Sequence, residues 1–553
     1  MFVRIKTTPN SPRKSVQIVQ SVRRGANVCQ KIVRYVGIAT NDHELEQLKM
    51  LAESIKIRLE EENQELLFSP EDLAKMKVNP PKKEISEEDY RVNIKDLKEE
   101  QRVVNGIHDI YGSLFDELRY NCAMKNPARN KHMLEIFKNI VLARIANPLS
   151  KKASIDMLEE EFGVSIDLHK VYRMMDKLDE ESIQRIKNIT YENTKNLFNG
   201  KIDIIFFDAT TIYFEAFKED TLRQCGYSKD LKFKEVQILL GLMVTKEGLP
   251  IGYEVFEGSK YEGHTVIPSL RKIKETYEID KVVFVADQGM YNRENLEAME
   301  KEGIEYIVGA RIKNMKTDLK EEILKIENYR NINKDTKINE LEIGKENRLI
   351  LRYTAKRARK DRYERERAVK NLKKKIEGKK NAKEYLTNYG YKKYLTIEGV
   401  NRIKINEEKI KEAEKWDGIH GIITNSKWIK AEEAIEQYKN LWQVEEAFRI
   451  TKHDLKVRPI YHWKPERIRA HIAISFTAYS LVKHLSYRIK LQYKKLSAEN
   501  IRQILIKAQT SILYDNKKRI RYGLPSKISK DASKIYQALN KKYKLTPYII
   551  KKM

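Results

Sequence analysis

Residues 202–211 read IDIIFFDATT, an apolar run that leads directly into Asp208. Such a run is typical of a strand buried on both faces, which would carry the carboxylate of Asp208 to a solvent-facing part of a sheet. The pattern recurs at residues 282–292, VVFVADQGMYN, where the run leads into Asp287 and Gly289 allows the chain to turn. We therefore expect two strands to present one aspartate each, although either residue alone also fits a turn or a helix cap.

Further short β-rich runs surround these two strands. They read VQILLGLMV at 236–244, GYEVFEG at 252–258 and EYIVGA at 305–310. A helical stretch is expected over 265–278, so the order predicts an α/β fold with a mixed sheet. After Ala310 the pattern gives way to a lysine-rich stretch of roughly a hundred residues, which is longer than ordinary connections and predicts an inserted subdomain. Its residues 356–383 hold 14 basic and 4 acidic side chains, which indicates either a solvated helix face or a surface for DNA phosphates.

A third acidic residue is expected on a helix over residues 432–463. Five of its side chains share one face by their spacing: Tyr438, Leu441, Glu445, Arg449 and Lys452. An amphipathic core helix with a salt-bridged Glu445 would show the same periodicity. Glu446 is the adjacent rival, but a shift of one residue turns a side chain by about 100° around the helix. Glu215 and Glu254 are further acids in the sheet region.

These motifs resemble those of a known family. Tyr438, Glu445 and Lys452 match three of the four positions of the Tyr-Arg-Glu-Lys signature of DDE transposases in the insertion sequence four superfamily. Leu441 occupies the position of the arginine, and Arg449, one turn beyond Glu445, is a candidate to replace it. IIFFDATT and FVADQGMYN resemble the first two motifs of the same family.

The resemblance covers about residues 199–490 and implies both a fold and a reaction. The fold is similar to ribonuclease H, with a large insertion before the glutamate-bearing helix. Asp287 lies 79 residues after Asp208 and 158 residues before Glu445, which leaves room for that insertion. In such enzymes the three acids bind two ions, Mg²⁺ or Mn²⁺, and clustered carboxylates favour a cation on general grounds because they repel each other. The resemblance implies that the enzyme hydrolyses the DNA ends of its element and then joins the freed 3′ hydroxyls to target DNA.

The resemblance also implies how DNA is held. Lys452 and Arg449 would contact phosphates near the scissile bond, and Arg458 would lie in a basic turn beside them. Tyr438 or Trp442 would stack on a displaced base, although core packing is the commoner role of such a tryptophan. A homodimer on double-stranded DNA is expected, since two element ends are handled together with the target.

The charge of the chain agrees with a polyanionic partner. Its 553 residues include 108 Lys and Arg against 80 Asp and Glu, a formal charge of +28, although a lysine-rich background composition would have the same effect. Residues 1–41 contain eight basic residues and no acidic one, and they predict a small basic hairpin. Helices are expected over 43–63 and 85–120, with a linker at 79–83.

A second candidate for DNA contact lies at residues 150–178. Amphipathic helices are expected on both sides of Gly163, a spacing that fits a helix-turn-helix and also an ordinary helical hairpin. In the DNA-binding interpretation Lys170, Arg173 and Lys177 would contact phosphates.

We expect the following organisation: N-terminal basic hairpin and helices (1–120), a helical region with the candidate helix-turn-helix (121–198), the first part of the catalytic domain (199–312), the insertion (313–417), the second part with the Glu445 helix (418–490) and a C-terminal helical region (491–553). The three cysteines lack the spacing of a zinc site or a disulfide framework, and the apolar run 472–482 is too short to span a bilayer. The expected protein is therefore cytoplasmic. Two alternatives stay open: a DNA-binding protein without catalysis, and a ribonuclease H-like nuclease that cuts without joining.

Overall fold

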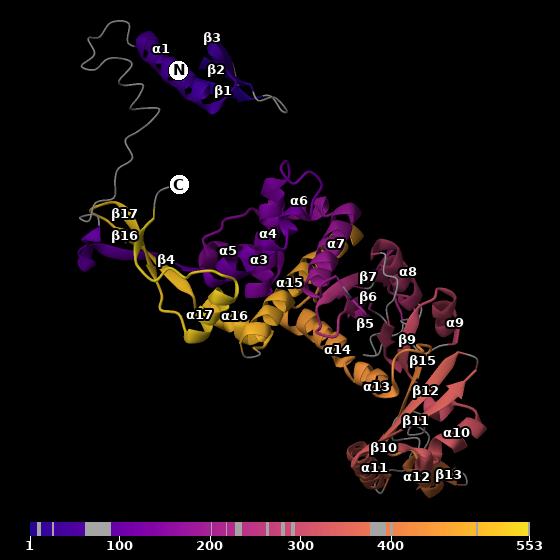
Figure 1. The fold of residues 1–553 in the computed structure, drawn as a ribbon. Helices are drawn as coiled ribbons and strands as arrows, with labels where there is room; N and C mark the ends of the chain where they lie inside the picture. Colours follow the sequence, from indigo (N-terminus) through magenta and orange to yellow (C-terminus); the bar gives the residue numbers. More distant parts are fainter. Residues whose placement is uncertain are drawn as a thin grey trace. The chain divides into compact units, whose positions relative to one another are not determined.

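The computed structural model describes residues 1–7, 13–24, 27–60, 90–200, 202–216, 218–226, 235–260, 265–277, 283–288, 293–344, 346–376, 394–398, 402–493 and 496–550. The chain forms two compact units, Met1–Lys95 and Asp96–Met553 (Figure 1). The linker expected at 79–83 lies outside the described residues.

The N-terminal unit is a three-stranded antiparallel sheet with a helix on one face. The elements are β1 (Phe2–Thr7), β2 (Lys14–Arg24), β3 (Asn27–Ala39) and α1 (Asp42–Glu60). Val16 and Ile18 of the central strand pack with Leu45 and Ala52 of α1. The expected hairpin is therefore β2 and β3, and the basic segment before it adds a third strand.

The second unit is built on a nine-stranded sheet in the order β10-β11-β12-β15-β9-β8-β5-β6-β7. The strands are β5 (Ile204–Tyr213), β6 (Gln237–Val244), β7 (Pro250–Glu257), β8 (Val283–Ala286), β9 (Glu305–Gly309), β10 (Arg330–Asn333), β11 (Thr336–Ile343), β12 (Asn347–Thr354) and β15 (Ile419–Thr424). β5, β8 and β9 run parallel, whereas β5, β6 and β7 form an antiparallel meander. A meander of three strands followed by two strands parallel to the first is the ribonuclease H arrangement, so the expected fold class is confirmed.

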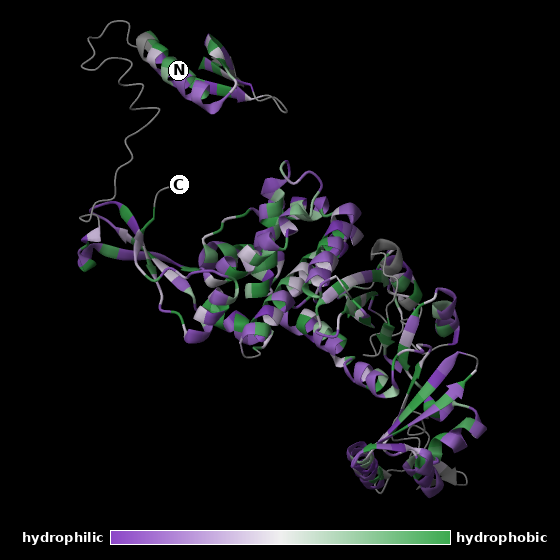
Figure 2. Cartoon of the chain, viewed as in Figure 1, coloured by the Kyte–Doolittle hydropathy of each residue, from purple (hydrophilic) through white to green (hydrophobic). Residues whose placement is uncertain are grey.

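The lysine-rich insertion contributes to this same sheet. β10, β11 and β12 pair in sequence and join the sheet through β15, which lies against β9. The other insertion elements are α10 (Thr317–Leu324), α11 (Ala355–Ile376), β13 (Leu395–Glu398), β14 (Arg402–Ile405) and α12 (Glu407–Glu414). Figure 2 shows α11 mostly in hydrophilic colours, and ion pairs such as Lys360–Glu364 at 3.7 Å run along it. Residues 377–383 of the basic stretch lie outside the described residues.

Helices cover both faces of the sheet. One face packs against α8 (Val266–Tyr277), α9 (Arg293–Lys301) and α10 through a core that includes Phe207, Leu296 and Ile323. The other face packs against α13 (Ala431–Lys439), α14 (Trp442–Arg449) and α15 (Pro465–Gln492), in a core that includes Phe206, Val444 and Ala473. We call the face that packs against α8, α9 and α10 the rear face, and the face that packs against α13, α14 and α15 the site face.

Helix α15 is the centre of the second unit. It is buried on all sides from Ala470 to Leu485, which is typical of an interior helix and explains the apolar run at 472–482. Within the described part of the chain, no helix has the length and apolar character needed to cross a membrane. The same core reaches from Val104 to Leu539, so the N-terminal helices of this unit and its C-terminal segment fold together with the sheet.

Two regions expected to be helical contain strands. β4 (Leu97–Val104) lies within the segment 85–120, and it pairs with β16 (Gln509–Asp515), which pairs in turn with β17 (Ile520–Pro525) and β18 (Tyr548–Ile549). The helices of these regions are α3 (Ser113–Glu117), α16 (Ala498–Ile506) and α17 (Lys530–Ala538). The helical prediction was wrong for β4 and β16 because their pairing partner lies about four hundred residues away, and local periodicity carries no information about it.

The candidate helix-turn-helix consists of two helices, as expected. They are α5 (Lys151–Phe162) and α6 (Leu168–Lys177), and both pack with α4 (Lys131–Ala146); the next helix is α7 (Glu180–Leu197), which packs on β7 and α15. Gly163 ends α5 with φ of +67°, a left-handed conformation that glycine adopts without strain.

Candidate active site

The two aspartates lie at the same level of neighbouring parallel strands. Phe207 of β5 and Ala286 of β8 are register partners, and Asp208 and Asp287 follow them directly. Neighbouring strands are about 4.8 Å apart, so the two backbones bring the carboxylates close together. Asp208 is half-buried and accepts a hydrogen bond from the backbone N–H of Ala209 at 2.8 Å, while Asp287 is exposed.

Alternation along the strands fixes the direction in which these side chains leave the sheet. Phe206 and Val285, two residues before each aspartate, belong to the core of the site face. Because side chains two apart on a strand share a face, Asp208 and Asp287 point toward the face that α13 and α14 cover. The two acids and the glutamate-bearing helix therefore meet on one side of the sheet.

The expected single helix over 432–463 is divided in the structure. α13 ends at Lys439, α14 begins at Trp442, and a π-helix (Ile450–Asp454) follows before the chain becomes irregular. Leu441 is buried in the core of the site face with 8% of its surface exposed. The tight turn lets Leu441 enter the core while Tyr438 and Glu445 line one cavity, and a continuous periodicity in the sequence does not reveal such a turn.

Tyr438 contacts Asp287 directly. Its hydroxyl donates a hydrogen bond to Asp287 Oδ1 at 3.3 Å. The hydroxyl lies against Gly309 at the end of β9, where a Cβ atom would collide with it. Burial raises the pKa of Tyr438, and the charges of Asp287 and Glu445 raise it further, so the hydroxyl stays protonated and acts as a donor.

Glu445 and Asp287 line a cavity of about 300 Å³ between the site face and the helix pair. The helix wall also includes Ile435, Tyr438, Lys439, Leu441 and Trp442, and the sheet wall includes Arg352 of β12 and His420 of β15. The rival acids are engaged elsewhere. Glu446 lies 3.7 Å from Arg449, Glu254 pairs with Lys187 at 2.7 Å and Lys272 at 3.0 Å, and Glu215 is exposed just after β5.

The expected DNA-contacting residues divide into two groups. Lys452 lies in the π-helix and donates a hydrogen bond to Thr210 Oγ1, two residues beyond Asp208 on the same face of β5. Arg449 is exposed and pairs with Glu446 at 3.7 Å and Asp454 at 3.6 Å, so it does not stand in for the signature arginine at the cavity wall. Arg458 is half-buried in the segment that follows.

Lys170 and Arg173 belong to a different part of the unit. Both are exposed on α6, a helix that packs on α4, α5 and α15, and Lys170 pairs with Asp167 at 3.2 Å. The structure therefore brings Tyr438 and Lys452 to the aspartates and leaves the α6 residues on another surface.

Sequence patterns missed Arg352, Arg357 and His420. His420 is largely buried, its ring lies 5.2 Å from that of Tyr438, and burial, Arg357 and Arg352 together lower its pKa to about 4. All three come from segments assigned to the insertion or just after it, which show no motif. The sequence held one signal. Ile350 and Arg352 lie two residues apart in a strand pattern, so Arg352 shares the site face with Ile350.

The donor chemistry of the site fits a divalent cation. Carboxylate oxygens are the ligands that Mg²⁺ and Mn²⁺ prefer, and Asp208, Asp287 and Glu445 supply them from one side of the sheet. Among the residues that the structure describes, no three His, Cys, Asp or Glu side chains are grouped closely enough to hold an ion. Asp208 and Asp287 follow register partners on neighbouring strands, and Asp287 lines the same cavity as Glu445.

Comparison with known proteins identifies the family. The model of the family described as transposase DDE domain matches residues 199–481, slightly more than half of the chain. The chain belongs to this family, and it is a DDE transposase, an enzyme of DNA transposition. DDE transposases use divalent metal ions. No curated protein matches the chain.

Solved structures of transposases are also similar to the chain. One is the piggyBac transposase synaptic complex with hairpin DNA, at 9% identity over 72% of this chain and 76% of that chain, with a TM-score of 0.36. Another is the Mos1 transposase paired-end complex with left transposon end, at 13% identity over 48% of this chain and 78% of that chain, with a TM-score of 0.14.

Proposed function

We propose that this transposase binds the terminal inverted repeats of an insertion sequence, cleaves the DNA there and joins the 3′ ends to target DNA. The placement of Asp208 and Asp287 at one level of neighbouring strands, on the face covered by the Glu445 helix, carries this proposal. Water attacks the phosphorus and the bond to the 3′ oxygen breaks, which leaves a 3′ hydroxyl. That hydroxyl then attacks a target phosphodiester and displaces the target's own 3′ oxygen.

The side chains have separate roles in this reaction. Asp208, Asp287 and Glu445 would hold two ions, Mg²⁺ or Mn²⁺, which when bound stabilise charge on the attacking and leaving oxygens. Tyr438 fixes the orientation of Asp287 through its hydrogen bond. Lys452, held beside Asp208 by Thr210, contacts a phosphate next to the scissile bond.

The experiment that tests the proposal compares three proteins on DNA that carries the element's own ends. Wild type is expected to cut and join in the presence of Mg²⁺, and Glu445→Gln to bind the ends without cutting. Glu446→Gln is the matched control, since it makes the same change one residue away. Equal cutting by wild type and Glu445→Gln would show that Glu445 is not one of the catalytic residues. Cutting without joining would favour the nuclease, and binding by a wild type that never cuts would favour the non-catalytic DNA-binding protein.

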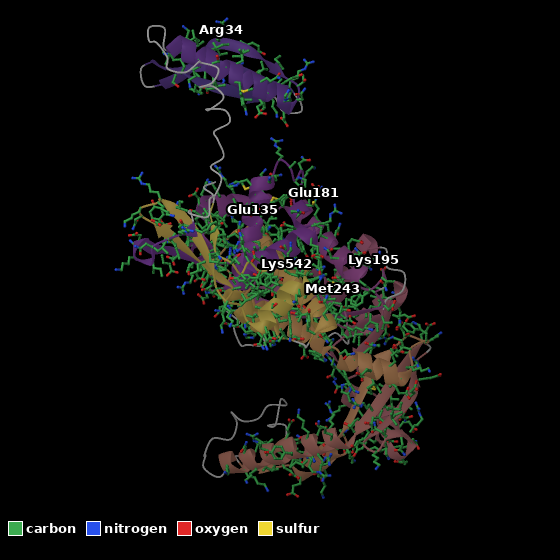
Figure 3. All side chains as sticks on the ribbon, turned by 60° about the vertical axis from the view of Figure 1, so that its left-hand side comes forward. Arg34, Glu135, Glu181, Lys195, Met243 and Lys542 are labelled. Atoms are coloured by element: carbon green, nitrogen blue, oxygen red, sulfur yellow. The ribbon has the colours of Figure 1, made fainter. Side chains whose placement is uncertain are left out.

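We further propose that the N-terminal unit recognises the repeats. The sheet segment 1–41 carries eight basic residues and no acid, whereas the five acids of residues 1–60 all lie on α1. Its basic side chains include Lys31 and Arg34, both exposed on β3; Arg34 is labelled in Figure 3. A sheet can contact DNA in this way when its charged face meets the groove.

Charge reversal tests this recognition in the full chain. Lys31→Glu with Arg34→Glu is expected to weaken binding to end DNA at least tenfold. Lys170→Glu with Arg173→Glu on α6 is the matched pair of changes. If only the α6 pair weakened binding, the candidate helix-turn-helix would be the part that recognises the repeats.

The proposal also includes membership of the insertion sequence four superfamily, a homodimer on DNA and a cytoplasmic location. The spacing of Tyr438, Glu445 and Lys452 supports the first of these.

A further inference from the structure

The cavity beside Asp287 contains positive charge that the reaction described above does not use. Arg352 and His420 are register partners on β12 and β15, and Arg357 lies at the start of α11. All three line the cavity that also holds Asp287 and Glu445. Two guanidinium groups, one on β12 and one on α11, thus line the same cavity as the carboxylates from the side of the insertion.

We propose that Arg352, Arg357 and His420 form a subsite that binds a backbone phosphate of the DNA strand being cut. The inference rests on the proposed function and deepens it, since it names the part of the substrate that this cavity takes. Arg352 and Arg357 act as positioning residues for that strand, and His420 is the uncharged donor between them.

The Nε atom of Arg352 supports the binding of an anion in the cavity. This atom is buried and has no hydrogen-bond partner among the described residues. A buried donor without a partner destabilises the protein, and the cost is larger when the donor belongs to a charged group. A phosphate oxygen in the cavity would satisfy this donor, because guanidinium groups match phosphates with paired N–H bonds.

The charges around the cavity point the same way. Burial lowers the pKa of Arg352, Glu436 opposes this, and Arg357 adds to it. Arg357 has Asp361 one turn away at 3.7 Å, a long ion pair on an exposed surface. The two arginines therefore repel each other near His420. A bound anion would attract both guanidinium groups and offset that repulsion.

The position of Leu441 explains why this chain places arginines there. The signature of the family has an arginine where this chain has Leu441, and Leu441 lines the same cavity. Its side chain is buried in the core of the site face, so position 441 supplies no cation, and Lys439 of the same wall pairs with Glu436 at 3.2 Å. Arg352 and Arg357 supply one from the opposite wall, across the space that Asp287 and Glu445 share.

The test uses the full chain, made unable to cut by Glu445→Gln, and end DNA in which single phosphates are replaced by neutral methylphosphonates. One such replacement near the cleavage point is expected to weaken binding about tenfold. In the background of Arg352→Gln with Arg357→Gln the same replacement is expected to have no further effect, because the contact is already absent. Arg359→Gln, an exposed position on the same helix, is the control and should retain the full effect.

Cleavage by chains with an intact Glu445 is the second measurement. The double variant is expected to cut at least tenfold more slowly, with a shallower dependence of binding on salt. A variant that keeps the wild-type melting temperature, cleavage rate and methylphosphonate pattern would overturn the subsite. If wild type itself does not cut, the proposed function fails, while the binding comparison still decides the subsite.

Discussion

Gly309 sets the position of the Tyr438 hydroxyl, and this contact can be tested at the scale of one methyl group. A Cβ atom at position 309 would collide with that hydroxyl, so Gly309→Ala is expected to move Tyr438 away from Asp287. We predict a fall in cleavage of about tenfold, the size of one lost hydrogen bond to a charged group, together with a lower melting temperature.

The control is a double-mutant cycle with Tyr438→Phe, which removes the hydroxyl that the new methyl group meets. Gly309→Ala should cost clearly less stability in the Tyr438→Phe background than in wild type. Additive losses of stability would show that the two residues do not interact, and the assigned role of Gly309 would be wrong.

Individual residues of the site differ in how far the sequence predicts them. Asp208 and Asp287 each follow an apolar run, so their places, on β5 and directly after β8, follow from local pattern alone. Arg352 and His420 reach the same face through β12 and β15, whose pairing depends on contacts remote in sequence. Arg449 fits the helix spacing equally well, yet it pairs with Asp454, because the helix gives way to a π-helix just beyond it.

At the scale of elements, the segment after Glu445 depends on a buried arginine. Arg144 of α4 donates hydrogen bonds to the carbonyls of Leu455 at 2.8 Å and Lys456 at 3.0 Å, directly after the π-helix that carries Lys452. Burial lowers the pKa of Arg144 to about 10, which leaves it charged at neutral pH. Arg144→Met should cost about 2–4 kcal/mol, because one buried and one partly buried carbonyl lose their donor.

The same change is expected to slow cleavage, since Lys452 loses its support. Tyr120→Phe is a suitable comparison, because it removes hydrogen bonds to Thr190 and Ser480 in the same core without touching the site. Measurements of melting temperature and cleavage rate for both variants would separate general instability from displaced Lys452. Equal cleavage per folded molecule in the two variants would contradict the prediction.

The elements themselves show where sequence patterns end. Apolar runs located β5, β6, β7, β8 and β9, and helical periodicity located α5, α6 and α8, because each carries its own pattern of burial. β4 reads as part of a helix, since its residues LKEEQRVV carry no strand alternation and only pairing with β16 makes them a strand. The insertion appeared as a separate body because its lysine content hides three strands that extend the main sheet.

Across the whole second unit, buried histidines predict sensitivity to acid. Burial lowers the pKa of His484 to about 3, and both of its ring nitrogens lack hydrogen-bond partners among the described residues. His462 and His420 have their pKa values lowered to about 4, in each case chiefly by burial. Because the folded pKa lies below the unfolded value of 6.5, the unfolded chain binds protons first, and stability falls as pH drops below about 6.5.

The prediction is a melting temperature that decreases steadily between pH 6.5 and pH 4. His484→Leu removes one of these groups and should flatten the curve, since His484 alone accounts for about 3–5 kcal/mol at the acid limit. His132→Leu, at an exposed position, is the control and should leave the slope unchanged. A slope that His484→Leu does not alter would assign the acid sensitivity to other groups.

The pairing of β4 with β16 has a consequence for synthesis on the ribosome. The N-terminal unit is complete once its helix has emerged, and units near the start of a chain fold first during translation. β4, in contrast, waits for a partner made about four hundred residues later, and the core also requires Leu539. A message cut short anywhere in that interval would leave a folded basic sheet and no folded enzyme. On the proposed role of the N-terminal unit in binding the repeats, we predict that such a fragment occupies DNA ends without cutting them, so that broken copies of the gene act as inhibitors of intact ones.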